Sequence, residues 1–270
     1  MDTLQAVIIA IVEGLTEYLP VSSTAHMVFT EKLLGMEHNN FVELFTYCIQ
    51  FGAILAVVVL YWRKFFDFKR INFYMKLICG VIPALVLGVL FNDKISAMLE
   101  SVRTIAIVLV LGGIVLLFID KLFQNPTITD EKNITVKQAV AIGFWQCLAM
   151  MPGVSRSAAS IIGGMQQKLN RETAAEFSFF LAVPTMLAVN VYALTLKKWE
   201  ENGAVVKGYE MLASNMGHLG LFLLGNLIAF VIAILAIKFF VEMIKKYGFK
   251  MWGWYRIIIG IALLAYFQNC

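Results

Sequence analysis

The sequence predicts an all-α integral membrane protein with six transmembrane helices and two re-entrant helical hairpins in an inverted-topology repeat. Three observations lead to this fold class: an apolar excess, six apolar stretches of nearly bilayer-spanning length, and two polar segments broken by proline. Of the 270 residues, 60% are hydrophobic and 15% are charged, whereas soluble domains carry about 25% charged residues. Too few polar residues remain to cover a water-soluble surface, so a bilayer is the expected solvent.

Six apolar stretches are predicted to cross the membrane as helices, for which about 20 residues are needed. They are residues 41–61, 75–91, 103–120, 177–196, 217–241 and 253–267. The second and the last of them are short and are expected to extend by a few residues.

Two further apolar stretches, residues 5–19 and 138–151, each end in a cluster of Pro, Gly and Ser. A helix of about 15 residues rises only ~22 Å, which is short of a hydrocarbon core of ~30 Å. Each stretch is followed by a second short apolar segment, at residues 26–34 and 158–169. We therefore predict two re-entrant hairpins, whose irregular backbone must be buried by protein or line a wet cavity.

The two hairpins, over about 5–34 and 138–169, read as copies of one segment. A single fixed shift in residue number, which we call the repeat offset, aligns Gln5 with Gln138. The same shift aligns the following residues of the first hairpin with those of the second. The other identical pairs are Ala6/Ala139, Val7/Val140, Ile9/Ile142, Leu15/Leu148, Val21/Val154, Ser22/Ser155 and Ala25/Ala158. At the same offset Glu13 falls on Gln146, Ser23 on Arg156 and Thr24 on Ser157.

Three predicted spans separate the hairpins, and an odd number of spans reverses orientation. We expect a single membrane domain over 1–270, with inverted repeats at about 1–120 and 134–270. Broken helices in inverted repeats place a polar site near the membrane midplane, where the breaks meet.

Basic residues predict the orientation. One side holds twelve of them, and the other side holds five. The first set is Arg63, Lys64, Lys69, Arg70, Lys76, Lys121, Lys132, Lys137, Lys245, Lys246, Lys250 and Arg256. The second set is Lys94, Arg103, Lys197, Lys198 and Lys207. The richer side is expected to be cytoplasmic, which puts both termini and the loops 93–100 and 197–214 outside. Clusters between apolar runs, with a net charge of only +4, argue against nucleic-acid binding.

The first hairpin carries two acids in an apolar helix. Glu13 and Glu17 lie four residues apart, so a helix puts them on one face. Two buried carboxylates require a cation, a shared proton or water. The competing interpretation is a solvated helix face near the membrane surface.

Pro20 ends this helix, and hydroxyls follow at Ser22, Ser23 and Thr24. Hydroxyls and free backbone N–H groups at a helix start form an anion-binding arrangement, although a serine there can also serve as a simple N-cap. His26 is three residues after Ser23, so both can face one cavity, and histidine can act as a general acid or base. A lone histidine can instead be a hydrogen-bonded structural residue.

The second hairpin breaks at Pro152 and Gly153, where glycine allows close approach of a ligand to the backbone. Arg156 follows as a permanent charge at a helix start, with Ser155, Ser157 and Ser160 beside it. Its planar guanidinium suits phosphate oxygens. The alternative is a structural ion pair with Glu13 or Glu17, and one arginine could do both in turn.

Together these residues offer a nucleophile, an acid or base, a carboxylate pair and a phosphate clamp within reach of lipid. The residues therefore predict phosphoryl transfer or hydrolysis on a lipid phosphate. A transporter or channel for an anion is the rival, because inverted repeats with broken helices are a transporter architecture. A flippase for the lipid phosphate is a variant of that rival, and a purely structural scaffold explains intramembrane charges poorly.

The chain resembles the undecaprenyl-pyrophosphate phosphatases of the bacitracin-resistance type. The first motif of that family is a Glu/Gln-x-x-x-Glu pair running into Pro-Val-Ser-Ser-Thr-x-His, and Glu13 to His26 match it without a gap. The second is Pro-Gly-x-Ser-Arg-Ser-x-x-Thr, which Pro152 through Ser157 match, with Ser160 in place of the final Thr. Ala25 stands where glycine is common. The resemblance extends over essentially the whole chain.

The resemblance implies a hydrolase of a phosphoric anhydride in the bacterial inner (cell) membrane. It would remove the terminal phosphate of undecaprenyl diphosphate, giving undecaprenyl phosphate and inorganic phosphate. This recycling of the lipid carrier serves peptidoglycan synthesis and cell-wall biogenesis. It gives resistance to bacitracin, an antibiotic that competes for the substrate rather than binding the protein. A divalent cation, Mg²⁺ or Ca²⁺, and a homodimer are also implied.

The resemblance also implies roles for individual residues. Ser23 would be the nucleophile, with His26 as the alternative. Glu17 would be the base or a metal ligand, and Glu13 its partner in the metal and proton network. Arg156 would hold the diphosphate and stabilise the transition state. The remaining phosphate-binding residues would be Ser22, Thr24, Ser155, Ser157 and Ser160.

Overall fold

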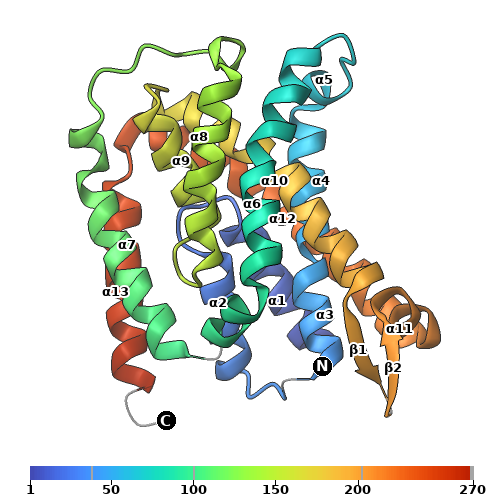
Figure 1. Cartoon of the computed structure of the whole chain (residues 1–270). Helices are drawn as coiled ribbons and strands as arrows, with labels where there is room; N and C mark the ends of the chain where they lie inside the picture. The colour runs from blue at the N-terminus through green and yellow to red at the C-terminus, as the bar shows by residue number, and fades with distance from the viewer. Residues whose placement is uncertain (38, 100, 202, 268–270) are drawn as a thin grey trace.

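The computed structural model describes residues 1–37, 39–99, 101–201 and 203–267, with the side chains of 92–99 left out. Helices dominate this part of the chain (Figure 1). The α-helices are α1 Thr3–Thr16, α2 Ser23–Leu33, α3 Asn40–Cys48, α4 Gln50–Leu60, α5 Trp62–Phe65, α6 Ile71–Leu99, α7 Val102–Leu122, α8 Val136–Cys147, α9 Arg156–Gln166, α10 Arg171–Val191, α11 Gly208–Ser214, α12 Met216–Tyr247 and α13 Lys250–Tyr266.

Shorter elements connect them. The short helical turns are η1 Glu131–Asn133, η2 Leu148–Met150 and the π-helical η3 Tyr192–Leu196. Strands β1 Lys198–Glu201 and β2 Ala204–Lys207 pair antiparallel, with Lys198 opposite Lys207.

Five helical segments in the described residues are long and apolar enough to cross a membrane, which makes the chain a multi-pass, predominantly α-helical membrane protein. They are Asn40–Leu60, Ile71–Phe91, Val102–Leu122, Arg171–Leu196 and Met216–Tyr247. These segments correspond to the first five predicted stretches. The sixth prediction coincides with α13, which has 17 residues and rises only about 25 Å.

The connections differ from the prediction in three places. The helix of the first predicted span is interrupted at Ile49, which separates α3 from α4. The predicted outer loop 93–100 is helical up to Leu99, because α6 continues past the apolar window, and Glu100 lies outside the described residues. The predicted loop 197–214 contains β1, β2 and α11, so the chain is not purely α-helical.

The two hairpins have the same local structure at the repeat offset. Helices α1 and α8 begin at equivalent positions, Thr3 and Val136, each with a capping box, formed by Asp2 with Gln5 and by Thr135 with Gln138. Helices α2 and α9 both begin and end at equivalent positions. Both first helices stop several residues before their prolines, α1 at Thr16 and α8 at Cys147.

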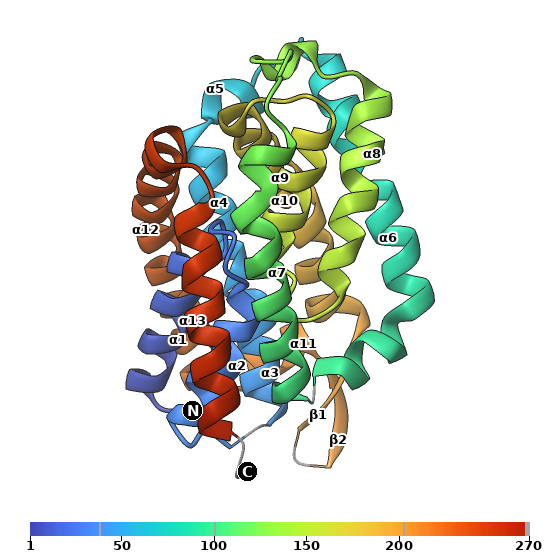
Figure 2. The same ribbon diagram turned by 90° about the vertical axis from the view of Figure 1, so that its left-hand side faces the viewer.

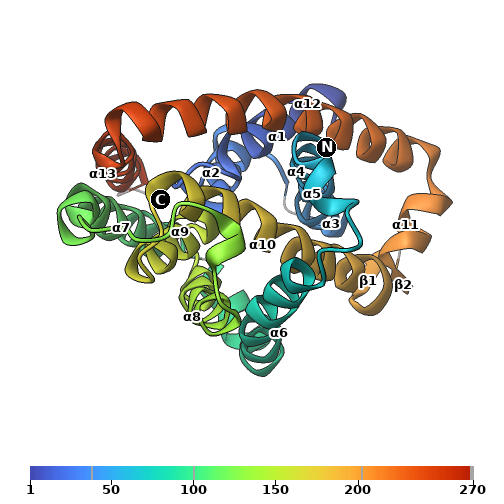
Figure 3. The same cartoon turned by 90° about the horizontal axis from the view of Figure 1, so that it is seen from above.

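The hairpins enter the molecule from opposite ends and turn back near its middle (Figures 1 and 2). Each first helix packs on a long helix of the other half of the chain, α1 against α12 and α8 against α6. Seen from above, α12 runs along one side, α6 and α8 lie on the opposite side, and α10 passes between them (Figure 3). This arrangement surrounds both turns with protein.

Small residues allow the close helix contacts, as is common between helices in membranes. A Cβ atom at Gly14 of α1 would lie 2.8 Å from the Ala229 carbonyl oxygen of α12. A Cβ atom at Gly143 of α8 would collide with the backbone of Gly80 in α6.

The largest buried apolar cluster lies directly beside the turns. Tyr18, at the first turn, packs edge-on against Phe179 of α10, with ring centroids 5.2 Å apart. Phe179 in turn contacts Phe240 of α12. The irregular backbone of the first hairpin is therefore anchored on an aromatic core.

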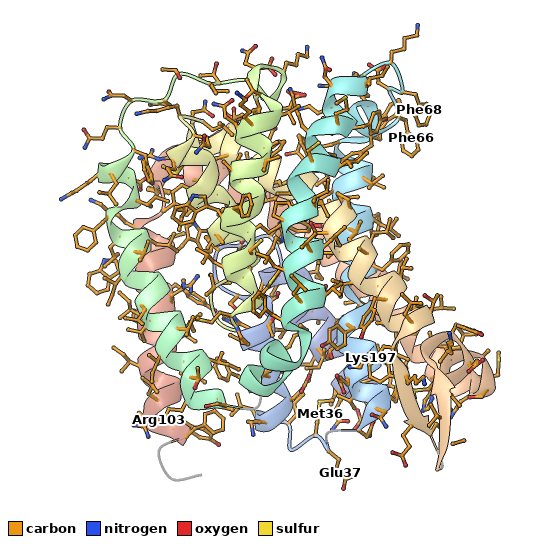
Figure 4. All side chains as sticks on the ribbon, in the orientation of Figure 1. Met36, Glu37, Phe66, Phe68, Arg103 and Lys197 are labelled. Carbon is orange, nitrogen blue, oxygen red and sulfur yellow. The ribbon has the colours of Figure 1, made fainter. Side chains whose placement is uncertain are left out.

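Most of the predicted cytoplasmic basic residues gather at one end, which also carries the exposed Phe66 and Phe68 (Figure 4). Arg103 and Lys197 lie toward the opposite end (Figure 4). Arg256 was wrongly counted among the basic residues that predict the orientation, because its side chain is fully buried between α7 and the two hairpin turns. The predicted position of the C-terminus falls on residues 268–270, outside the described residues.

Candidate active site

The helix starts after the two breaks have the same unusual backbone. Ser22 has φ +70° and Ser155 has φ +76°, a region that non-glycine residues rarely adopt. Such strain costs about 1–3 kcal/mol per residue and persists only where surrounding contacts hold it. Both serine side chains cap the following helix, accepting from the N–H groups of Ala25 and Ala158. The N-cap interpretation of the first hairpin therefore holds for Ser22, and Ser155 caps its helix in the same way.

A buried chain of three polar groups connects the hairpins. The Ser23 hydroxyl donates to Glu17 Oε2 at 2.5 Å, and Arg156 Nη2 donates to Glu17 Oε1 at 2.8 Å. Ser23 and Glu17 belong to the first hairpin, whereas Arg156 begins the helix of the second. One carboxylate therefore accepts from a hydroxyl and a guanidinium at the same time, and the alternative of an Arg156–Glu17 ion pair is present.

Other groups fix the Arg156 guanidinium. Its Nη1 donates to the Ser178 carbonyl oxygen at 3.0 Å, and the Ser178 hydroxyl lies 2.6 Å from that of Ser160. Its Cζ atom lies 5.4 Å from the centroid of the Tyr18 ring, a cation–π contact. Its buried Nε has no hydrogen-bond partner within the described residues. One donor of the guanidinium thus has no acceptor among the described residues.

The remaining predicted hydroxyls divide into two groups. Ser157 donates to the Leu19 carbonyl oxygen at 2.7 Å and lies 3.1 Å from Ser155, so it ties the second hairpin to the first. Ser160 donates to the Arg156 carbonyl oxygen at 2.8 Å. Thr24 is half-buried and has no hydrogen bond to this cluster in the described part of the chain. The structure therefore gives Ser157 and Ser160 supporting contacts within the protein.

Glu13 is the least satisfied acid of the cluster. Its side chain is fully buried, and neither carboxylate oxygen has a hydrogen-bond partner among the described residues. Gln146, at the equivalent position of the second hairpin, likewise has an unpartnered Oε1, while its Nε2 donates to Thr185. Oxygen atoms buried without donors are what a proton or a divalent cation would satisfy.

A divalent cation fits this donor set. Mg²⁺ is usually held by one or two carboxylates, with waters and substrate phosphates completing its shell. Glu13 and Glu17 supply two carboxylates, one of which has no other partner in the described chain. In the same described part no group of three or more His, Cys, Asp and Glu residues gathers around one point. A cation here would depend on the substrate for further ligands.

His26 has other partners in this structure. Its Nδ1 lies 2.8 Å from the Ser22 carbonyl oxygen, and its Nε2 lies 2.9 Å from the Tyr255 hydroxyl. Because a carbonyl only accepts, the neutral ring carries its proton on Nδ1, and Nε2 accepts from Tyr255. The two rings are also stacked, with an interplanar angle of 7°. The structure thus brings Glu17, Ser23 and Arg156 together but directs both nitrogens of His26 elsewhere.

Gly153 meets two requirements at the second break. Its φ of +94° suits glycine, and a Cβ atom there would lie 2.7 Å from the Ile105 carbonyl oxygen. Pro152 precedes it in the turn, as Pro20 lies in the first turn, so all three predicted break residues lie in irregular backbone.

Four residues of the site were not predicted from the sequence: Tyr18, Ser178, Tyr255 and Arg256. Tyr18 lies inside the first motif, between Glu17 and Pro20, so its position in the sequence could have identified it as a residue of the site. Ser178 interrupts a run of aromatic residues as a buried hydroxyl. Tyr255 and Arg256 gave a weaker signal, since a basic residue near a helix end usually lies in the membrane interface.

Two surface cavities lie at the basic end of the described chain, around Glu131, Arg70 and Lys132. Neither is lined by a residue of the Ser23–Glu17–Arg156 chain. The buried charges mark the candidate site, because charges inside a membrane protein are costly and are usually functional.

The fold and this centre define a multi-pass membrane protein with a buried serine–carboxylate–arginine site between two broken-helix hairpins. Residues 6–262 match the family described as bacitracin resistance protein BacA, and the chain belongs to this family. A similar protein of Flavobacterium johnsoniae, named undecaprenyl-diphosphatase, is 50% identical over 98% of this chain and 96% of its own length. The protein of that name from Porphyromonas gingivalis strain W83 is 47% identical over 98% of this chain and 96% of its own length. Undecaprenyl-diphosphatase 1 of Clostridioides difficile is 41% identical over 99% and 97%.

Glu17→Gln tests the energetic coupling of the two hairpins. It should lower the free energy of unfolding in detergent by about 3 kcal/mol, because the Arg156 charge stays buried without its anionic partner. Glu43→Gln is the matched control: it removes the carboxylate partner of Lys197 in a pair whose side chains are 27% and 30% exposed, against 12% and 6% for Arg156 and Glu17. We expect the control to cost under about 1 kcal/mol. Equal losses in the two variants would contradict the buried coupling.

Proposed function

We propose that the chain is an undecaprenyl-diphosphate phosphatase, which releases inorganic phosphate and leaves undecaprenyl phosphate. The observation that carries this proposal is the Ser23 hydroxyl donating to Glu17, with the Arg156 guanidinium on the other oxygen of the same carboxylate. A hydroxyl hydrogen-bonded to a base is an activated nucleophile, and the adjacent arginine suits developing phosphate charge. The names of the relatives and the membership of the family support the same substrate.

In the first step Ser23 Oγ attacks the terminal phosphorus of the diphosphate. The new Oγ–P bond forms as the bond from that phosphorus to the bridging oxygen breaks, and undecaprenyl phosphate leaves. Glu17 takes the serine proton. Arg156 stabilises the charge on the transferring phosphoryl oxygens, and its unpartnered Nε gives it a donor for that purpose.

In the second step water attacks the phosphoserine phosphorus as the Oγ–P bond breaks, and a proton of that water passes to a phosphoryl oxygen. Inorganic phosphate leaves, and Glu17 returns its proton to Ser23 Oγ. His26 is the alternative nucleophile, but its Nε2 would first have to leave the Tyr255 hydroxyl. We therefore assign the nucleophile to Ser23 and leave His26 as a proton-transfer group near the site.

The divalent cation remains a proposal. Glu13 and Glu17 would hold it, and a bound Mg²⁺ or Ca²⁺ would neutralise phosphate charge. The orphaned carboxylate of Glu13 supports this assignment, because burial of an unpaired carboxylate is otherwise costly. Ser22, Thr24, Ser155, Ser157 and Ser160 would surround the phosphates in the proposed cradle.

The finer architecture is part of the same proposal: six spans, with α13 as the sixth, and two re-entrant hairpins in inverted repeats. The matching bounds of α2 and α9 and the entry of the hairpins from opposite ends support it (Figure 1). The basic end would face the cytoplasm, and both termini and the opening of the site would be outside. We also propose a homodimer, and competition by bacitracin for the substrate alone.

Phosphate release from undecaprenyl diphosphate by purified protein in detergent tests the enzyme against the transporter. An enzyme releases phosphate without any membrane gradient, whereas a transporter or flippase releases none. We expect kcat to fall about 10²–10⁴-fold in Glu17→Ala and about 10²–10³-fold in Arg156→Ala. Ser23→Ala should be the most severe of the three. Near-normal turnover by Ser23→Ala would remove Ser23 as the nucleophile.

The cation can be tested without measuring activity. Addition of Mg²⁺ or Ca²⁺ to chelator-treated wild type should raise its Tm, because a ligand that binds only the folded state stabilises that state. Glu13→Gln should abolish the rise, and Glu43→Gln should keep it. If Glu13→Gln responds as the wild type does, Glu13 is not a cation ligand.

Two exposed positions at opposite ends test the orientation. In a Cys270→Ser background, Val205→Cys should react with a membrane-impermeant maleimide in intact cells, because Val205 is 70% exposed at the proposed outer end. Phe68→Cys, at a position 75% exposed in the basic end, should react only after permeabilisation. The reverse pattern would invert the proposed topology.

A further inference from the structure

Arg256 is the other buried arginine at the hairpin turns. It lies in α13 with its side chain fully buried. Its Nη1 donates to the carbonyl oxygens of Pro20 at 3.1 Å and Val154 at 2.9 Å, and its Nη2 donates to that of Gly153 at 2.7 Å. Its Nε donates to the Leu109 carbonyl oxygen of α7 at 3.2 Å. The Arg256 side chain therefore donates hydrogen bonds to both hairpin turns.

Two of the carbonyls that it holds are equivalent in the two hairpins. The repeat offset places Pro20 on Gly153, as it places Ser23 on Arg156. Each of these two carbonyls lies three residues before the side chain that the proposed reaction uses. Between them stand Ser22 and Ser155, whose positive φ angles persist only where contacts hold the backbone.

The partners of Arg256 are neutral. None of the ion pairs among the described residues includes it, whereas Arg156 pairs with Glu17. Its five N–H donors form a rigid planar fork, which can hold several carbonyl groups in fixed directions. Four of these donors are already used. Because backbone carbonyl groups already accept from most of its donors, Arg256 is not free to bind a phosphate, so its role differs from that of Arg156.

We propose that Arg256 is a positioning residue that fixes the two hairpin breaks relative to each other, so that Ser23 and Glu17 of one meet Arg156 of the other. The proposal rests on the function proposed above. It adds α13, from outside both hairpins, as a third component on which the rate of phosphate release depends.

Gly112 of α7 offers a way to displace this guanidinium without removing it. The three heavy atoms nearest to a Cβ at position 112 are Nη2, Cζ and Nε of Arg256. Gly112→Ala should therefore displace the Arg256 guanidinium, which donates to the carbonyl groups, without removing its charge. Gly260→Ala is the matched control, since its Cβ would meet Val110 and Ala106 at the same α7–α13 interface, away from the guanidinium.

Wild type, Gly112→Ala, Gly260→Ala and Arg256→Lys are purified and compared by size exclusion, Tm, kcat and KM for undecaprenyl diphosphate. We expect both glycine variants to stay folded with similar losses in Tm. Gly112→Ala should lose about tenfold to a hundredfold in kcat, because a displacement near 1 Å costs that much in a positioned reaction. Gly260→Ala should stay within about twofold of wild type. Arg256→Lys should be as impaired as Gly112→Ala or worse, since an ammonium cannot reproduce the fork.

Each other outcome overturns a defined part of the proposal. Equal kcat values for folded Gly112→Ala and Gly260→Ala would show that the position of Arg256 does not matter to the reaction. Loss of folded protein in both Gly112→Ala and Arg256→Lys would make Arg256 a folding residue and overturn the positioning role. Absence of phosphate release by wild type would instead remove the proposed function itself.

Discussion

The structure depends on one constraint: backbone groups freed where helices break in the interior must find partners inside the protein. Helices α1 and α8 both stop near the middle of the molecule (Figure 1). The carbonyl groups of Leu19, Pro20, Gly153 and Val154 receive hydrogen bonds from the side chains of Ser157 and Arg256. Away from water each unsatisfied group costs several kcal/mol. Satisfying the turns therefore also determines where the polar residues that follow them lie.

This constraint explains why the proposed reacting groups come from both halves of the chain. Each hairpin supplies a capped helix start, but the residue after the cap is Ser23 in one and Arg156 in the other. Glu17 accepts a hydrogen bond from Ser23 and another from Arg156. A carboxylate shared between a hydroxyl and a guanidinium can become the base for the first and the charge partner of the second. Neither hairpin alone contains that combination.

Much of this could be predicted from the sequence. The apolar stretches give the long helices, because hydropathy and length are local properties. The repeat offset predicts that Ser23 and Arg156 occupy equivalent positions, because it pairs residues at the same place in two copies of one hairpin. Arg256 could not be predicted, since its burial depends on α13 packing against α7, and four carbonyl partners leave no pattern in a sequence. The residue type and spacing of His26 indicate acid–base chemistry. The direction of its side chain, however, depends on the hydrogen bond with Tyr255, which is far away in the sequence. The strands β1 and β2 were not predicted, because each has only four residues, too few to show an alternating pattern.

The packing of α1 against α12 and of the turns against Arg256 has a consequence for the order of biosynthesis. The first hairpin emerges early from the ribosome, but its partners lie in the last third of the chain. Arg156 is made earlier, but until α12 and α13 are made Glu13 and Glu17 lack part of the protein that shields them from lipid. A newly made first hairpin is therefore best solvated at the membrane surface or beside the insertion machinery. It can take its final place only once α12 and α13 arrive, so the site is assembled late.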